Sequence, residues 1–380
     1  MRGIEFFSAL TEARPTDSRW SDLAAGIVVF RLAEAALNDV RTDRSLLSEA
    51  KRQVAGVTRL TLNLRLRDIL KGLESPAQRD SNWRRTVGRK LMAYGLELHR
   101  AGEYGPAADA FALIYECVPD DPALHTQAMQ QRAFMLRLLA RFDDAEVVYQ
   151  HLEQSASDVA DVATRLEAQL GMARLVAGRG NLPAAEDIIR SVVRDARHFR
   201  QATVAANGLI DLAWIAGARH KPDEVLTYSY EALPHIGLRS IDGDELRERT
   251  LINIATALRE LSRSTAATTV ARHVATVARS ADLRAAALTV LYHVAIDDRN
   301  APMAAAYRDA LATERMATTT ALEYYEAMTR EHATFERFAD ARVSAKRMLA
   351  VSEVLRLNEF SFRAEAALKE LANGRVPNVL

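Results

Sequence analysis

Residues 91–111 read LMAYGLELHRAGEYGPAADAF and carry the clearest structural pattern in the sequence. Small and apolar residues flank a turn at regular positions: Gly95, Leu98, Gly102, Tyr104, Ala107 and Phe111. Their helical spacing on both sides of Gly102 predicts two helices joined by a tight turn. Pro119 follows where the second helix is expected to stop.

Weaker copies of this unit follow along the chain. In the first copy, the expected second helix carries a small residue, Ala107. A residue at the corresponding position recurs in six more copies: Ala145, Ala185, Val225, Ala267, Ala304 and Ala341. Successive copies are 38, 40, 40, 42, 37 and 37 residues apart. A single hairpin of this size cannot bury its apolar face, so neighbouring hairpins must stack into a continuous core.

The unit at residues 91–111 resembles the tetratricopeptide repeat (TPR), which has a period of about 34 residues. The longer spacing here indicates longer helices or connections. The resemblance implies an all-α, right-handed α-solenoid of about seven TPR-like helix-turn-helix repeats over residues 83–348. An N-terminal helical extension and a C-terminal capping helix complete the expected fold.

The two ends of the chain differ from the repeats. Residues 1–80 are expected to form an N-terminal helical segment, with one helix over 18–39 and another over 45–73. The stretch 74–82, which contains Ser75-Pro76, is the expected linker. Residues 349–372 are expected to form one long closing helix, and 349–380 as a whole the capping helix and tail.

Composition restricts the class of protein. The 50 basic and 50 acidic residues cancel, so net charge does not favour nucleic acid, although residues 1–90 carry 17 basic against 11 acidic side chains. The single cysteine, Cys117, is expected in the core of a reducing, cytoplasmic compartment. The sequence contains neither a signal peptide nor an apolar run long enough to span a membrane, so no membrane association is expected.

No pattern of catalytic or metal-binding residues stands out. The nine histidines are scattered, and none has the paired helical spacing of a metal site. A phosphate-binding glycine loop and a nucleophile elbow are both missing from the sequence. We therefore expect a protein that is not an enzyme, with no cofactor, no metal and no catalytic residue.

In the TPR family the first helices of successive hairpins line a concave groove that holds a peptide or a partner helix. The resemblance therefore implies a partner-binding groove lined by polar and aromatic residues: Gln131, Phe134, Arg137, Arg174, Asn207, Asp211, Trp214, Arg249, Asn253 and Arg259. Amide side chains can satisfy an extended ligand backbone, arginine can hold a carboxylate, and an aromatic ring can anchor an apolar group. An inert, solvated inner surface with Trp214 in the core is the alternative.

The expected function is that of a scaffold or adaptor that binds a protein or peptide ligand. The layout of a helical head before seven repeats also resembles the bacterial Rap-type quorum-sensing receptors, which implies a peptide-sensing regulator as an alternative. A nucleic-acid contact through basic residues of the head, such as Arg59 and Arg65, is less well supported, because no helix-turn-helix pattern accompanies them. Alanine-rich outer faces leave a homodimer open.

Overall fold

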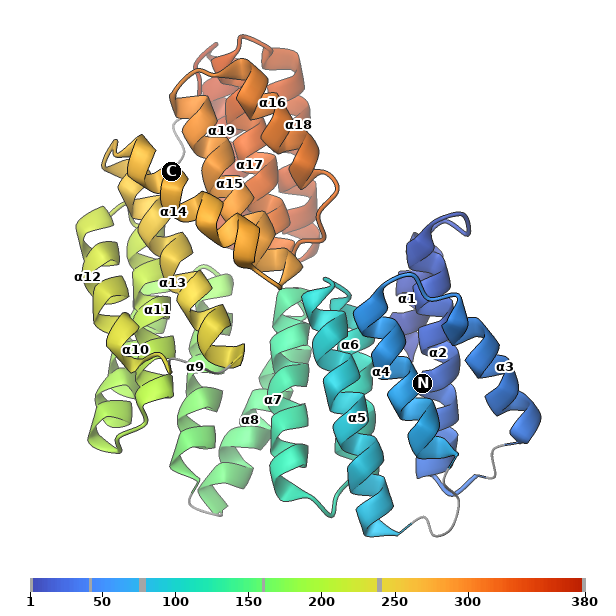
Figure 1. The fold of residues 1–380 in the computed structure, drawn as a ribbon. Coiled ribbons are helices and arrows are strands. Elements are labelled where there is room, and N and C mark those ends of the chain that lie inside the picture. The colour runs from blue at the N-terminus through green and yellow to red at the C-terminus, as the bar shows by residue number, and fades with distance from the viewer. Residues whose placement is uncertain (1–2, 41–42, 75–79, 159–160, 238–240, 378–380) are drawn as a thin grey trace. The chain divides into compact units, whose positions relative to one another are not determined.

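The computed structural model describes residues 3–40, 43–74, 80–158, 161–237 and 241–377. Within these ranges the chain forms 19 α-helices and one short 3₁₀ helix, with no strand. Figure 1 shows the α-helices in their order along the chain. The fold is the all-α solenoid that the repeats predicted. The chain forms two compact units, unit 1 up to Leu152 and unit 2 from Glu153, and their boundary falls inside α8. Residues 75–79 of the expected linker lie outside the described ranges.

Unit 1 holds the N-terminal helices and the first hairpins. Its helices are α1 (Ile4–Glu12), α2 (Ser18–Leu37), α3 (Arg44–Ala55), α4 (Leu60–Leu73), α5 (Ser81–Arg100), α6 (Tyr104–Cys117), α7 (Pro122–Leu138) and α8 (Phe142–Asp158), which continues into unit 2. The single helix expected over 45–73 is wrong, because the chain leaves the helix between α3 and α4. Asn63 donates a hydrogen bond to the carbonyl of Val54 at 2.7 Å, which satisfies a backbone group at that break.

The N-terminal helices pack on the first hairpin. A Cβ on Gly26 of α2 would overlap the hydroxyl of Tyr94 of α5, so these helices can approach closely only with glycine at this position. Arg19 of α2 makes two hydrogen bonds to Glu103, at 2.8 and 2.9 Å, across the α5–α6 turn. The head of the chain is therefore part of unit 1 and covers the end of its core.

Unit 2 holds the remaining hairpins and a last single helix. Its helices are α9 (Val162–Gly178), α10 (Leu182–His198), α11 (Ala202–Ala218), α12 (Pro222–Ala232), the 3₁₀ helix Leu233–His235, α13 (Ile241–Glu260), α14 (Ser264–Val277), α15 (Ala281–Asp297), α16 (Ala301–Leu311), α17 (Thr318–Thr334), α18 (Phe338–Val354) and α19 (Asn358–Ala372). The closing helix expected over 349–372 is wrong: α18 ends first, Arg356 takes a left-handed backbone conformation with φ of 54°, and α19 begins afresh.

Every hairpin has the same turn between its two helices. One residue at the end of each first helix has positive φ: Gly102, Ala140, Gly180, His220, Ser262, Arg299 and Glu336. In the third hairpin the amide of Asn181 donates to the carbonyl of Val176 at 3.1 Å, which is the six-residue bond of a Schellman cap. The small residue five positions after each turn residue is at most 2% exposed, so the two helices of each pair cross there without room for a larger side chain.

The turn between α9 and α10 lies beside the start of α19. A Cβ on Gly180 would stand 3.5 Å from the backbone nitrogen of Glu359 and 3.7 Å from Cβ of Asn358. The third hairpin and the last helix of unit 2, which are far apart in sequence, are therefore neighbours in space.

Candidate functional site

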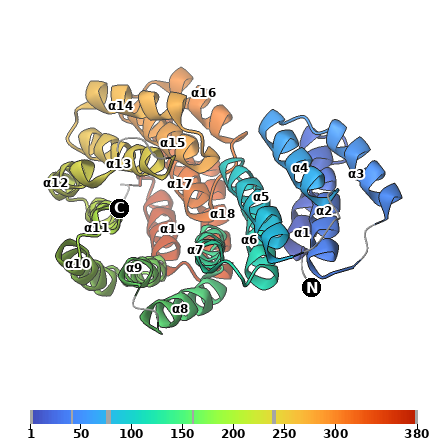
Figure 2. The same ribbon diagram turned by 60° about the horizontal axis from the view of Figure 1, so that its bottom comes forward.

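The candidate site is the inner face of unit 2. Figure 2 shows the first helices α9, α11, α13, α15 and α17, together with α19, on the inside of the curve of unit 2, while α10, α12, α14 and α16 lie outside. Each of these first helices packs against the next one in the series, α9 on α11, α11 on α13, α13 on α15 and α15 on α17, and α17 packs on α19. The inner face is therefore a continuous layer of six helices.

One position of each first helix defines a row along this face. The residue six places before the left-handed turn residue is Arg174 in α9, Trp214 in α11, Thr256 in α13, His293 in α15 and Arg330 in α17. We call these five residues the inner row. Four of the five are polar or charged, in contrast to the alanine-rich core beneath them.

Asp211 lies at the centre of the first half of the inner face. Its carboxylate accepts a hydrogen bond from Nε of Arg174 at 2.8 Å and another from Nη2 of Arg249 at 3.2 Å. Its side chain is only 8% exposed, so both interactions occur with little water around the carboxylate. Through this one side chain, three successive first helices are joined.

Amide side chains add neutral links beside this ion pair. Asn207 of α11 donates to Glu167 of α9 at 3.1 Å, and Asn253 of α13 donates to the carbonyl of Ile210 in α11 at 3.1 Å. Burial raises the pKa of the Glu167 carboxyl, while Arg174 and the Asn207 amide oppose that rise. Each amide therefore has at least one of its groups committed to the neighbouring helix.

The second half of the inner face repeats this arrangement with other residues. Asp297 of α15 accepts from Arg259 of α13 at 3.4 Å and from Arg330 of α17. Arg363 of α19 donates to Glu326 of α17, with Nε to Oε1 at 3.0 Å and a second bond to Oε2. Ion pairs thus connect every pair of adjacent first helices from α9 to α17, and α17 to α19.

Trp214 differs from its charged neighbours because its ring is open to solvent. The side chain is 42% exposed. Trp214 follows Asn207 by seven residues and Asp211 by three, so all three lie on the same face of α11. The alternative expectation, that Trp214 is a core residue, does not fit this exposure. An exposed tryptophan beside ionic and amide groups can pack against an apolar group of a ligand.

The predicted site residues of unit 1 form a separate cluster on α7. The ring of Phe134 meets the edge of His99 at 5.3 Å between centroids, and the guanidinium of Arg137 lies 5.0 Å from the Phe134 centroid. Gln131, one turn earlier on α7, is half-buried. The structure therefore joins Phe134 to the preceding hairpin through His99 of α5, while the other predicted residues belong to unit 2.

Glu167, Asp297 and Arg363 are among the inner-face residues that the sequence did not reveal. Glu167 stands thirteen residues before its turn residue, as do Asn207 and Arg249, so counting from the turns could have found it. Arg363 was missed because residues 349–372 were expected to form a cap rather than a further inner helix.

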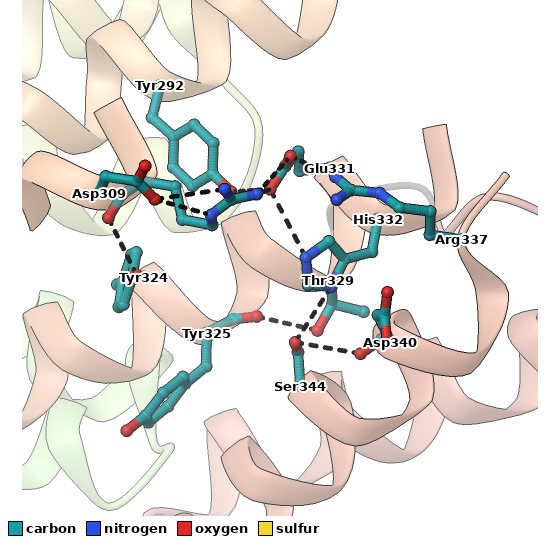
Figure 3. Close-up of polar contacts among 11 residues, drawn as sticks. Tyr292, Asp309, Tyr324, Tyr325, Thr329, Glu331, His332, Arg337, Asp340 and Ser344 are labelled. Atoms are coloured by element: carbon teal, nitrogen blue, oxygen red, sulfur yellow. Dashed lines mark hydrogen bonds and ion pairs between the residues drawn. The ribbon is translucent and has the colours of Figure 1, made fainter. Parts of the chain in front are cut away.

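A second polar cluster, centred on Glu331, lies between the last two hairpins (Figure 3). Its carboxylate is 1% exposed and accepts from the hydroxyl of Tyr292 at 2.6 Å, from Nη1 of Arg308 at 2.9 and 3.1 Å, and from Arg337. Burial and the bond to Glu331 raise the pKa of the Tyr292 hydroxyl. Because donors from the protein already bind this carboxylate, the cluster holds α15, α16 and α17 together and has little remaining capacity to bind a ligand.

The described residues carry neither a candidate metal site nor a candidate membrane span. Among them, no three His, Cys, Asp or Glu side chains are grouped so as to hold a metal ion. None of the helices in those ranges has the length and apolar character to cross a bilayer.

Comparisons with known proteins agree with the architecture. No family model matches the sequence, and no curated protein matches it either. The structure is similar to that of a Rap protein complexed with competence and sporulation factor, with a TM-score of 0.54 and 10% identity over 88% of this chain and 98% of that one. The TPR domain of P58(IPK) aligns with 90% of this chain and 98% of its own, at 14% identity and a TM-score of 0.26.

These observations define the class of protein. Seven hairpins with a repeated turn, the layer of first helices inside unit 2 and the similarity in fold to the Rap protein make this a TPR-like helical-repeat protein. At 10% identity the similarity concerns the fold alone.

Proposed function

We propose that the inner face of unit 2 binds a segment of another protein or a peptide. The observation that supports this most strongly is the exposed ring of Trp214 next to the Arg174–Asp211–Arg249 network. Tryptophan and arginine are the residues that most often dominate the free energy of protein–protein binding. An apolar side chain of the ligand would cover Trp214, and its backbone would reach the amides of Asn207 and Asn253.

The experiment compares two variants of the full chain with equal helical content by circular dichroism. One is Trp214→Ala/Asn253→Ala on the inner face; the other is the control Tyr230→Ala, which removes an aromatic ring that is 57% exposed on the outer helix α12. Each immobilised protein is incubated with lysate of the source cells. A protein retained by the wild type and the control, and lost by the inner-face variant, is the expected result. Equal retention by all three would contradict the inner face as the binding surface.

A second candidate function is peptide sensing, in which the bound ligand changes the shape of the solenoid. The similarity to the Rap protein favours it, because that protein was crystallised in complex with competence and sporulation factor and the alignment covers 88% of this chain. A sensor should change its radius of gyration in small-angle X-ray scattering when the ligand is added. A scaffold of fixed shape should show the same radius with and without the ligand.

A further inference from the structure

Three arginines act on His293 in the second half of the inner face. Arg259 comes from α13, Arg330 from α17 and Arg363 from α19, and burial together with these three guanidinium groups lowers the pKa of the His293 imidazole. All three charges act in the same direction and disfavour a positive charge at His293. An anionic group placed there would be attracted.

Carboxylates already pair with each of these arginines. Asp297 accepts from Arg259 and Arg330, Glu260 lies 4.0 Å from Arg259, and Glu326 accepts from Arg363. At His293 itself, however, the charges that act on the imidazole are the three guanidinium groups. A further carboxyl, Glu323, is affected most by burial, which raises its pKa to about 7 despite the opposing effect of Arg363, so it is only partly ionised at neutral pH.

Two polar atoms in this cluster have no hydrogen-bond partner among the described residues. They are Nη1 of Arg330 and Nδ1 of His293, and both are buried. A buried polar group without a partner destabilises the protein unless something else satisfies it. An oxygen of a ligand could accept from Arg330, and the imidazole can act as donor or acceptor according to its tautomer.

We infer that Arg330 and His293 bind a carboxylate of an acidic peptide whose apolar residue covers Trp214. This inference rests on the proposed function. It adds the charge of the ligand and the distance along the ligand between its acidic and its apolar residue. Trp214 and His293 occupy the same row two hairpins apart. Packed helices lie about 8–10 Å apart, so two steps span roughly 16–20 Å. An extended peptide advances about 3.3 Å per residue, which places the acidic residue about 5–6 residues from the apolar one.

The first test observes His293 directly by NMR of ¹³C-labelled imidazoles, with its signal assigned from the variant His293→Gln. The probes are acetyl-triglutamate amide, acetyl-trilysine amide and inorganic phosphate at matched ionic strength. We expect the acidic peptide to shift the His293 signal saturably and to raise the pKa of the imidazole, because a bound carboxylate offsets the surrounding guanidinium charges. The basic peptide should have no effect.

Two variants decide whether this cluster carries the binding. Arg330→Gln removes the unpartnered donor and leaves Asp297 paired with Arg259, so the fold should survive. Arg272→Gln removes an exposed arginine of the outer helix α14 and is the matched control. Affinity for triglutamate should fall roughly tenfold in Arg330→Gln and stay unchanged in Arg272→Gln. An unshifted His293 signal, or equal affinity in both variants, would overturn the inference, and binding of phosphate without triglutamate would overturn the assignment of a carboxylate.

The spacing has its own test with two peptides that carry one leucine and one glutamate. The peptide acetyl-Leu-Ser-Ser-Ser-Ser-Glu-amide should bind roughly tenfold more tightly than acetyl-Leu-Ser-Glu-amide, because only the longer one can reach both places at once. Equal affinities would overturn the spacing. If Trp214 is needed for a protein partner while triglutamate leaves His293 unchanged, the proposed function stands and only this inference fails.

Discussion

The carboxylate of Asp211 on α11 accepts a 2.8 Å hydrogen bond from Nε of Arg174 on α9. Each residue belongs to the first helix of a different hairpin, so the bond acts between repeats rather than within one. Interfaces between neighbouring repeats contribute much of the stability of a solenoid. The polar residues of the inner face therefore have a structural role in addition to the binding role proposed for them.

Replacing Asp211 by alanine should reduce the stability of unit 2. Both Arg174 and Arg249 would lose their acceptor in a partly buried position, and we expect a loss of about 1–3 kcal/mol in the free energy of unfolding. In a Trp20→Phe/Trp83→Phe background Trp214 is the only tryptophan, so its fluorescence in urea reports on unit 2 alone. Asp187→Ala, which removes an exposed acid of α10, should change stability by less than about 0.5 kcal/mol. Equal effects of the two substitutions would refute a role for the shared carboxylate.

Two glycines of α11 should respond in opposite ways to alanine. A Cβ at Gly208 would overlap the side chain of Val193 on α10, and we expect Gly208→Ala to destabilise unit 2 by about 1–3 kcal/mol. At Gly217 the nearest side-chain atom would stand 3.7 Å away, so Gly217→Ala should stabilise by about 0.5–1 kcal/mol through helix propensity. The same fluorescence assay measures both, and a common sign would show that packing is not what distinguishes them.

The left-handed turns predict that replacing one surface residue, Ser262, by glycine increases the stability of unit 2. Ser262 has φ of 58°, a conformation that costs roughly 1 kcal/mol for a residue with a side chain. Ser262→Gly should therefore raise the free energy of unfolding of unit 2 by about 0.5–1 kcal/mol. Gly180→Ala, at the equivalent turn with φ of 92°, should lower it, and serves as the converse control. A loss of stability in Ser262→Gly would contradict strain at this turn.

His99 should make unit 1 less stable as the pH falls below about 6.5, while Asp109, whose pKa burial raises to about 6, acts in the opposite direction. His99 is 5% exposed, and burial, with Arg100 and Arg137 adding to it, lowers the pKa of its imidazole to about 4. Between pH 6.5 and 4 the unfolded chain binds a proton that the folded chain does not, so acid favours unfolding, by at most about 3 kcal/mol.

The measurement is urea unfolding against pH in a Trp214→Phe background, where Trp20 and Trp83 report on unit 1. His99→Gln should lose less stability than the wild type as the pH falls through this window. His273→Gln, at an exposed position of α14 in unit 2, should leave this loss unchanged. A slope that persists in His99→Gln would assign it to another group.

The sequence predicted the hairpins because their turns recur together with a small residue five positions later. Ala107 follows Gly102 at this distance, as Ala145 follows Ala140, so the spacing of the anchors equals the spacing of the turns. The break at Arg356 could not be predicted in this way. A left-handed turn made by arginine carries no glycine signal, and the apolar periodicity runs on through it.

The sequence could predict which helix face carries the candidate site, but not which side chains pair with one another on it. Counting along the first helices found Arg174, Asp211 and Trp214, which the structure places on one surface. It could not show that Asp211 is shared by two arginines, because the repeats vary from 37 to 42 residues and the register between hairpins varies with them. Whether a polar side chain is committed to a neighbour or open to a ligand depends on that register.

The approach of Gly180 to the start of α19 changes how unit 2 can come apart. In an open array the terminal element has one neighbour, so it frays first and at little expense in free energy. Here the last helix touches the α9–α10 turn in addition to its neighbours α17 and α18, so detaching it breaks a further interface. Unit 2 is thereby protected against stepwise loss of hairpins from its C-terminal end, and its unfolding gains the cooperativity of a single block.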